Sequence, residues 1–213
     1  MLHPTIGWTI SKLLDHLNTG PAYVAITGSI GVGKTHLATR LAEETGAKLL
    51  IEQLNDRRLE TFYADTAGQA WDTELEFLEQ RTRLLSRDAA PWPGPGRLVI
   101  SDFWYDQSPA FARVWLPDEK QESFIEHWRR SRRRVVCAKL IVLLECSPAE
   151  LHRRVAGRDR PFECDLSERR LEQIGLAIAE QTTAPDQGPV LRLTNDDPEA
   201  VFEEVLAAIG AMQ

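Results

Sequence analysis

Residues 28–35 read Gly28-Ser29-Ile30-Gly31-Val32-Gly33-Lys34-Thr35, and this stretch decides the fold of the chain. It fits the pattern G-x-x-x-x-G-K-[ST], in which a glycine-rich loop connects a strand to a helix. The run before it, residues 22–27, is short, apolar and partly β-branched, which is typical of a buried strand. The run after it places Leu37 and Leu41 on one face of a helix. The sequence therefore predicts the strand, loop and helix of a phosphate-binding unit.

Each part of this loop has a chemical role toward a triphosphate. Glycine lets the backbone pass close to phosphate oxygens, where a Cβ would obstruct it. The N–H groups of residues 28–35 and the helix N-terminus supply converging positive partial charge. Lys34 is expected to reach the β- and γ-phosphates, and Thr35 to ligate Mg²⁺. We therefore predict that all eight residues bind ATP, although the motif does not identify the acceptor of a phosphate.

Length and composition restrict the class of protein. The chain of 213 residues, with 43% hydrophobic and 27% charged residues, suits a single α/β domain over 1–213. Its net charge of −7 argues against broad binding to nucleic acid or membranes, and the basic run 129–134 is interpreted as a solvated helix end. An odd number of cysteines argues against a disulfide framework. With no signal peptide or membrane-spanning stretch in the sequence, a cytoplasmic location is expected.

Four further apolar runs complete the predicted sheet, at residues 48–51, 98–101, 140–144 and 190–193. They do not alternate with polar residues, and helical segments separate them. This pattern predicts a three-layer α/β fold, with five parallel strands and helices on both faces. Residues 1–20 are expected to form a helical lead-in that covers the core.

Acidic residues follow two of these strands, Glu52 after the second and Asp102 after the third. Ligands of parallel α/β sheets sit at the carboxyl ends of the strands, so both acids are expected near the phosphate loop. There a carboxylate can bind Mg²⁺ or accept a proton from an attacking hydroxyl. The alternative is that each acid caps a turn at a strand end.

A cluster of arginines follows the fourth strand, in a lid predicted at about residues 151–165. Its members are Arg153, Arg154, Arg158 and Arg160. Arginines that close over a transferring phosphoryl group stabilise its spread charge electrostatically. The alternative is a helix end held by salt bridges.

From residue 22 to the C-terminus the chain resembles the deoxynucleoside kinase family of P-loop kinases, especially its bacterial members. The resemblance rests on the loop 28–35, the strand ending at Glu52, Leu59-Glu60-Thr61-Phe62-Tyr63, Thr73-Glu74-Leu75-Glu76-Phe77-Leu78 with Arg81, Ser101-Asp102-Phe103 and the arginine cluster. It implies transfer of the ATP γ-phosphate to the 5′-hydroxyl of a deoxynucleoside, and a homodimer.

The resemblance also implies roles for single residues. Glu52 would be the general base, and Asp102 would lie near Mg²⁺. Tyr63 would contact the sugar 3′-hydroxyl, and Arg81 would lie near the base and the 5′ end. Lys34, Arg153, Arg158 and Arg160 would neutralise the transferring phosphoryl group. Trp104, Tyr105, Phe111 and Trp115 could each stack on a base or pack in the core, and Trp104 is the preferred one to stack because it lies close to Asp102 in sequence.

The chain departs from the family pattern at three positions. Glu74 stands where the family usually has Gln, Phe103 where many members have Arg, and Ser108 where some members have an Asp that recognises the base. A shifted register that pairs Gln80 with Arg87 restores the Gln but spoils its spacing from Tyr63. The base preference is therefore left open.

Two other functions compete with the deoxynucleoside kinase. A kinase of nucleoside monophosphates or another small metabolite would use the same loop and lid. The segment Asp65-Thr66-Ala67-Gly68-Gln69 resembles the switch segment of small GTPases. However, no apolar strand leads into Asp65, and the sequence lacks the N-K-x-D motif that reads guanine.

Overall fold

A computed structural model describes residues 22–212 with the exception of 54, 89–91, 93–96, 159 and 164. The helical lead-in predicted for 1–20 lies outside the described residues. Within them, no helix combines the length and the hydropathy that crossing a membrane requires.

A five-stranded parallel sheet forms the middle layer, in the order β2-β3-β1-β4-β5. Its strands are β1 (Ala22–Gly28), β2 (Lys48–Leu50), β3 (Leu98–Ser101), β4 (Leu140–Glu145) and β5 (Val190–Thr194). These are the five predicted strands, and their ends differ from the predicted ones by at most one residue. The predicted α/β fold with a parallel sheet is confirmed.

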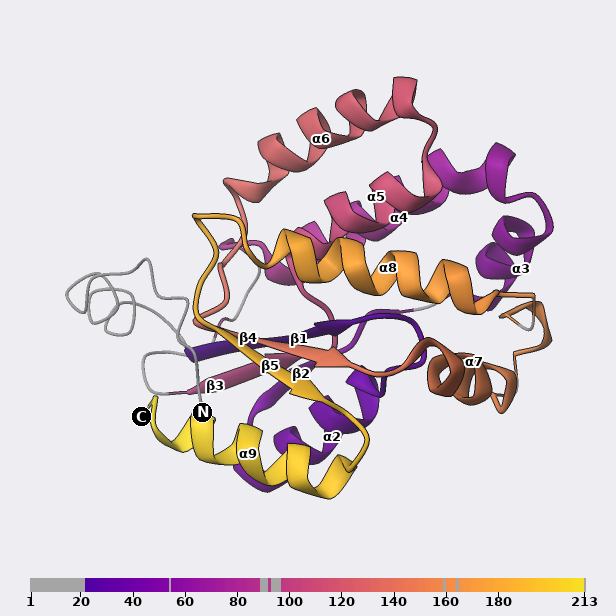
Figure 1. The fold of residues 1–213 in the computed structure, drawn as a ribbon. Coiled ribbons are helices and arrows are strands. Elements are labelled where there is room, and N and C mark those ends of the chain that lie inside the picture. Colours follow the sequence, from indigo (N-terminus) through magenta and orange to yellow (C-terminus); the bar gives the residue numbers. More distant parts are fainter. Residues whose placement is uncertain are drawn as a thin grey trace.

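Helices cover both faces of this sheet. They are α2 (Lys34–Thr45), α3 (Asp56–Ala64), α4 (Thr66–Leu85), α5 (Ser108–Trp115), α6 (Asp118–Arg132), α7 (Pro148–Ala156), α8 (Glu168–Gln181) and α9 (Pro198–Gly210), with short 3₁₀ turns η1 (Tyr105–Gln107) and η2 (Pro161–Glu163). Figure 1 shows α2 and α9 below the sheet and α4, α5 and α8 above it.

Alternate residues of β1 explain why both faces are covered. Val24 and Ile26 pack in one core cluster with apolar residues of α2 and α9, whereas Tyr23 and Ala25 pack in a second cluster with residues of α4. Successive side chains of a strand point to opposite faces, so a strand that is apolar at every position needs cover on both.

The carboxyl ends of the strands gather the segments that the sequence singles out. The phosphate loop follows β1, Glu52 lies two residues beyond β2, and Asp102 follows β3 directly. Because β3 lies between β2 and β1 in the sheet, Asp102 is placed between Glu52 and the loop. The arginine cluster begins in α7, beyond the carboxyl end of β4, on the right of Figure 1.

Candidate active site

At its first and last glycines, the phosphate loop has a backbone conformation that only glycine adopts without strain. Gly28 has a φ of 142° and Gly33 a φ of 101°. A Cβ on Gly28 would lie 2.3 Å from the carbonyl oxygen of Leu144, in the neighbouring strand β4. A Cβ on Gly33 would lie 2.8 Å from Asn195 Nδ2, which donates a hydrogen bond to the Val32 carbonyl at 2.6 Å. The two glycines therefore allow the loop to turn tightly against β4 and the end of β5.

Lys34 folds back over this loop. Its Nζ donates to the carbonyls of Gly28 at 3.0 Å and Ser29 at 2.9 Å. Burial lowers the pKa of Lys34 to about 8, although the charge of Glu52 acts in the opposite direction. The ammonium group is thus held at the centre of the loop, where P-loop proteins place a lysine for phosphate.

Thr35 and Asp102 meet at the first turn of α2. Thr35 Oγ1 donates to Asp102 Oδ2 at 2.6 Å, and the Glu52 backbone N–H donates to Asp102 Oδ1 at 2.8 Å. Burial raises the pKa of Asp102, and these two hydrogen bonds partly offset that effect. A hydroxyl and a carboxylate oxygen side by side are the donors that Mg²⁺ takes when it also binds phosphates, so the residues present fit that ion.

Glu52 and Arg81 form a partly buried ion pair next to Asp102. Arg81 Nε donates to Glu52 Oε1 at 2.6 Å, and Arg81 Nη1 donates to Ser108 Oγ at 2.8 Å. The Arg81 side chain is only 3% exposed. Arg81 thus links the loop after β2 to α5, and it holds Glu52 through one charge-assisted hydrogen bond.

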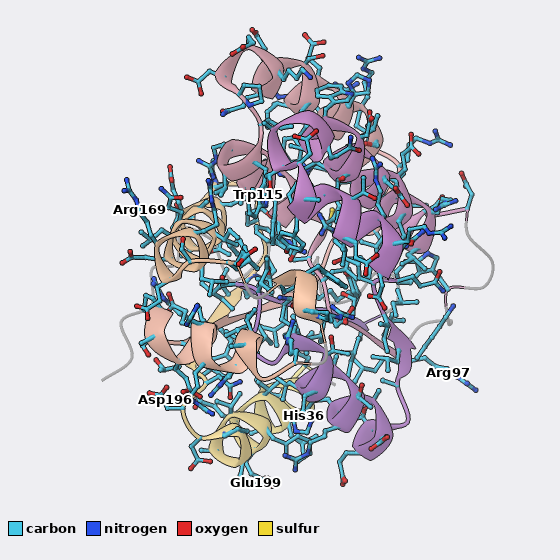
Figure 2. The ribbon with its side chains drawn as sticks, turned by 90° about the vertical axis from the view of Figure 1, so that its right-hand side faces the viewer. His36, Arg97, Trp115, Arg169, Asp196 and Glu199 are labelled. Atoms are coloured by element: carbon cyan, nitrogen blue, oxygen red, sulfur yellow. The ribbon has the colours of Figure 1, made fainter. Side chains whose placement is uncertain are left out.

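A cavity of about 410 Å³ connects these groups. Its phosphate-loop side holds Lys34 and Thr35, and Glu52 and Asp102 also line it. The remaining wall includes five aromatic side chains, those of Phe62, Tyr63, Phe77, Phe111 and Trp115. Figure 2 labels two lining residues, with Trp115 above and His36 below the space between them. A cavity of this size with apolar walls and a few polar groups suits a small molecule.

Glu74 is the unusual group in this cavity. The residue is 3% exposed, and its Oε2 has no hydrogen-bond partner. The adjacent Thr73 Oγ1 also lacks one. Burial raises the pKa of Glu74 to about 8, the charge of Arg81 lowers it, and the charge of Glu52 raises it. The carboxyl group of Glu74 is therefore mostly protonated at neutral pH.

Glu74→Gln is expected to make folding less dependent on pH. Because the pKa of Glu74 is raised from 4.5 to about 8, the folded state binds its proton more tightly than the unfolded state. As pH rises between these two pKa values, the wild type should lose stability relative to the variant, by roughly 1.4 kcal/mol per pH unit. Urea unfolding of both proteins at several pH values measures the difference. If the difference between the two free energies of unfolding does not change with pH, the pKa of Glu74 is not raised in the folded state.

The arginine cluster divides into two groups. Arg158 and Arg160 line the cavity, and both contact the buried carboxylate of Glu163, each with an N–O distance of 3.4 Å. Arg153 is 73% exposed and pairs with Glu150, outside the residues that line the cavity. Arg154 donates to the Asn195 carbonyl at 2.9 Å. Closure of this segment over a nucleotide stays a prediction.

Two predicted substrate residues have different surroundings. Tyr63 lines the cavity, where its ring stacks against Phe162 with centroids 6.1 Å apart, and burial raises its pKa. Trp104 does not reach this cavity. Its ring is buried in the core and lines a second cavity with Tyr23 and Arg132. The chain turns into η1 directly after Trp104, and the backbone N–H of Trp104 donates to Gln107 Oε1 at 3.2 Å. This turn directs the indole away from Asp102.

The switch-like segment 65–69 has a structural role. Asp65 is the N-cap of α4, and its Oδ1 accepts a hydrogen bond from the Gly68 N–H at 3.1 Å. Gln69 accepts one from Arg58 at 3.2 Å. None of these residues lines the cavity that contains Lys34. This placement counts against the GTPase alternative.

Several cavity residues were missed by the sequence reasoning. Phe77 lies three residues after Glu74 and four before Arg81, so helical spacing alone could have placed it on the same face. Gln107 accepts a hydrogen bond from Thr27 at 2.8 Å, and Glu163 anchors the arginines. The sequence carries no signal for these two, because their positions depend on how separate segments pack.

The fold and the cavity define a P-loop protein of the nucleotide-binding class, in which a lysine-bearing phosphate loop faces a pocket for a small molecule. The chain belongs to the deoxynucleoside kinase family, whose sequence profile matches residues 24–210.

Individual relatives agree with this assignment. A deoxyguanosine kinase of Bacillus subtilis is 28% identical over 203 residues, which cover 91% of this chain and 98% of the relative. A deoxyadenosine kinase of Dictyostelium discoideum is 22% identical over 223 residues, covering 100% of this chain and 89% of the relative. Among solved structures, the deoxyadenosine kinase of M. mycoides with bound dATP has a TM-score of 0.76 at 16% identity, covering 89% of this chain and 99% of that one. This last likeness concerns the fold.

Proposed function

We propose that this protein transfers the γ-phosphate of ATP to the 5′-hydroxyl of a deoxynucleoside, with a purine deoxynucleoside as the preferred acceptor. One observation carries the proposal: a single cavity has Lys34 and the phosphate loop on one side, aromatic walls with Glu74 on another, and Glu52 among its lining residues. The names of the curated relatives, a deoxyguanosine kinase and a deoxyadenosine kinase, support a purine.

On the donor side, the proposed roles follow from charge and position. The N–H groups of the loop and Lys34 bind the phosphates of ATP. Thr35 and Asp102 would hold Mg²⁺, which neutralises charge on the phosphate oxygens when it is bound. Arg158 and Arg160 stabilise charge on the transferring group. Arg153 would take part only after moving away from Glu150, so we give it no role.

On the acceptor side, Glu52 accepts the proton of the 5′-hydroxyl as that oxygen attacks. Its ion pair with Arg81 keeps Glu52 oriented for this step. The deoxyribose would lie near Tyr63, which we propose as the contact for its 3′-hydroxyl. The aromatic walls would enclose the base.

A nucleoside monophosphate fits this cavity less well as an acceptor. Its phosphate would stand where the 5′-hydroxyl does in the proposed complex, and it would face the carboxylate of Glu52. Arg81 is already engaged by Glu52 and Ser108. A phosphate acceptor would require a rearrangement of this pair.

The test is a transfer assay with ATP, Mg²⁺ and a panel of four deoxynucleosides and their 5′-monophosphates. We expect 5′-phosphorylated products from the deoxynucleosides, with purines preferred, and little product from the monophosphates. Lys34→Met should reduce this transfer by about a hundredfold or more, because one charge-stabilising donor is typically worth that much. Products formed mainly from monophosphates would replace the proposal with the competing kinase.

Assembly and location are also proposals. We propose a homodimer and a cytoplasmic location on the basis of the family resemblance. Light scattering on the purified protein tests the oligomeric state, and a monomeric mass at micromolar concentration would contradict the dimer.

A further inference from the structure

Gln80 on α4 holds the backbone of the segment that follows β2. Its Oε1 accepts a hydrogen bond from the Gln53 N–H at 3.1 Å, and its Nε2 donates to the Gln53 carbonyl at 3.0 Å. One side-chain amide thus pairs with both backbone polar groups of one residue, as a neighbouring strand would.

This segment needs such contacts because the sheet gives it little support. β2 is a strand of three residues at the edge of the sheet, and residues 51–53 beyond it have no regular secondary structure. Ile51 is 40% exposed, and Gln53 is exposed as well. A backbone in this setting moves unless side chains tie it down. Glu52, the proposed general base, lies in the middle of the segment.

Two successive residues of α4 hold two successive residues of this segment. Arg81 donates to the Glu52 carboxylate at 2.6 Å, while Gln80 pairs with the backbone of Gln53. Adjacent side chains of a helix point about 100° apart, so Arg81 reaches into the cavity whereas Gln80 does not line it. On the side of β3, Asp102 accepts a hydrogen bond from the Glu52 N–H at 2.8 Å.

Gln80 is therefore not placed to contact a substrate. Arg87, with which it would pair in the alternative register of the family pattern, donates instead to the Val135 carbonyl at 3.2 Å and does not line the cavity either. Any effect of Gln80 on the reaction has to pass through the backbone that it holds.

We propose that Gln80 is a positioning residue of the reaction, whose amide fixes the backbone at Gln53 and thereby sets where the Glu52 carboxylate stands relative to the acceptor hydroxyl. This inference rests on the proposed function, because it assumes that Glu52 accepts the proton of that hydroxyl. Proton transfer requires the two heavy atoms to lie within about 3 Å, and a displacement of about 1 Å can cost a hundredfold in rate. The contact with Arg81 does not fix this distance by itself, because the Glu52 side chain has several rotatable bonds and can keep that contact while its backbone shifts.

The test is a double-mutant cycle between Gln80 and Glu52. It measures the rate constant of phosphoryl transfer from Mg²⁺·ATP to deoxyguanosine in single turnovers, which separate the chemical step from product release. The proteins are the wild type, Gln80→Met, Glu52→Gln and the double variant. Met keeps the length of the side chain and removes both hydrogen bonds to Gln53. Gln173→Met, at an exposed position of α8, is the matched control and should leave the rate constant unchanged.

We expect Gln80→Met to lower the rate constant about tenfold and to leave the dissociation constant of deoxyguanosine within about twofold, since Gln80 does not line the cavity. In the Glu52→Gln background, the same substitution should change the rate constant by less than about twofold, because the base that Gln80 positions is already gone. Gln80→Asn retains the amide, but its shorter side chain does not reach both backbone groups of Gln53. It should therefore show the same loss as Gln80→Met.

Equal factors in the two backgrounds would show that Gln80 supports only the fold, and they overturn the inference. An unchanged rate constant in Gln80→Met or Gln80→Asn, or a loss confined to the binding of deoxyguanosine, also overturns it. Urea unfolding of each variant checks that the compared proteins are folded. If the wild type phosphorylates no deoxynucleoside, the proposed function itself fails. If the wild type is active and Glu52→Gln is slow, but the two substitutions are additive, only the role of Gln80 is refuted.

Discussion

Glu52→Gln is expected to lower kcat for phosphorylation of a deoxynucleoside by about a thousandfold, because general-base catalysis typically contributes 10²–10⁴. Gln can still accept the hydrogen bond from Arg81 Nε that Glu52 Oε1 accepts at 2.6 Å, so the cavity should keep its shape. The substitution removes only the basic carboxylate. Steady-state kinetics at saturating deoxynucleoside measure the effect.

Binding of ATP provides the control for this prediction. Glu52 contacts Asp102 only through its backbone N–H, which the substitution leaves in place. The dissociation constant of Mg²⁺·ATP should therefore stay within about twofold of the wild-type value, well below the factor of ten that 1.4 kcal/mol represents. Glu79 is an exposed residue of α4 that does not line the cavity, so Glu79→Gln should leave both kcat and ATP binding unchanged. A large loss of ATP binding in Glu52→Gln, with kcat preserved, would make Glu52 a metal-binding residue.

Gly28→Ala is expected to reduce the free energy of unfolding by about 2–5 kcal/mol. The backbone at Gly28 has a φ of 142°, which costs about 1–3 kcal/mol for a residue with a side chain. The new Cβ would also lie 2.3 Å from the carbonyl oxygen of Leu144, so the contact between β1 and β4 must open. Urea unfolding measures the loss, and ATP binding should be lost as the loop is displaced.

Gly46→Ala is the matched control, because it separates the effect of φ from that of crowding. Gly46 has a φ of 66°, and a Cβ there would meet nothing within 4 Å. This variant should cost about 1 kcal/mol and leave ATP binding intact. If both variants lose the same free energy of unfolding, the close contact with Leu144 does not contribute to the cost of a side chain at Gly28.

The sheet was predictable because its strands carry a strong local signal. Runs such as 140–144 are apolar at every position, and this pattern occurs in strands covered on both faces. Glu52 and Asp102 were predictable for a related reason, since each lies at the end of such a strand. Because the strands are parallel, both positions lie at the same edge of the sheet, and the strand order β2-β3-β1 places them side by side.

For some residues the sequence did not predict the surroundings of the side chain. These surroundings depend on which way a helix is rotated and on how distant segments pack. On α7, Leu151 and Val155 are buried, and adjacent residues of a helix point about 100° apart. Arg153 therefore faces solvent, whereas Arg154 reaches the Asn195 carbonyl. Trp104 lies two residues after Asp102 in sequence, but the turn into η1 directs it into the core. The burial of Glu74 and Glu163 comes from contacts between distant segments, which no local pattern encodes.

A crystal structure of the protein with a deoxynucleoside and an unreactive ATP analogue tests the account most directly. We predict that the 5′-oxygen of the deoxynucleoside lies within about 3 Å of the Glu52 carboxylate, with the base against Glu74 and the triphosphate in the loop at Lys34. A nucleoside bound in the second cavity, or with its 5′-oxygen directed away from Glu52, would contradict it.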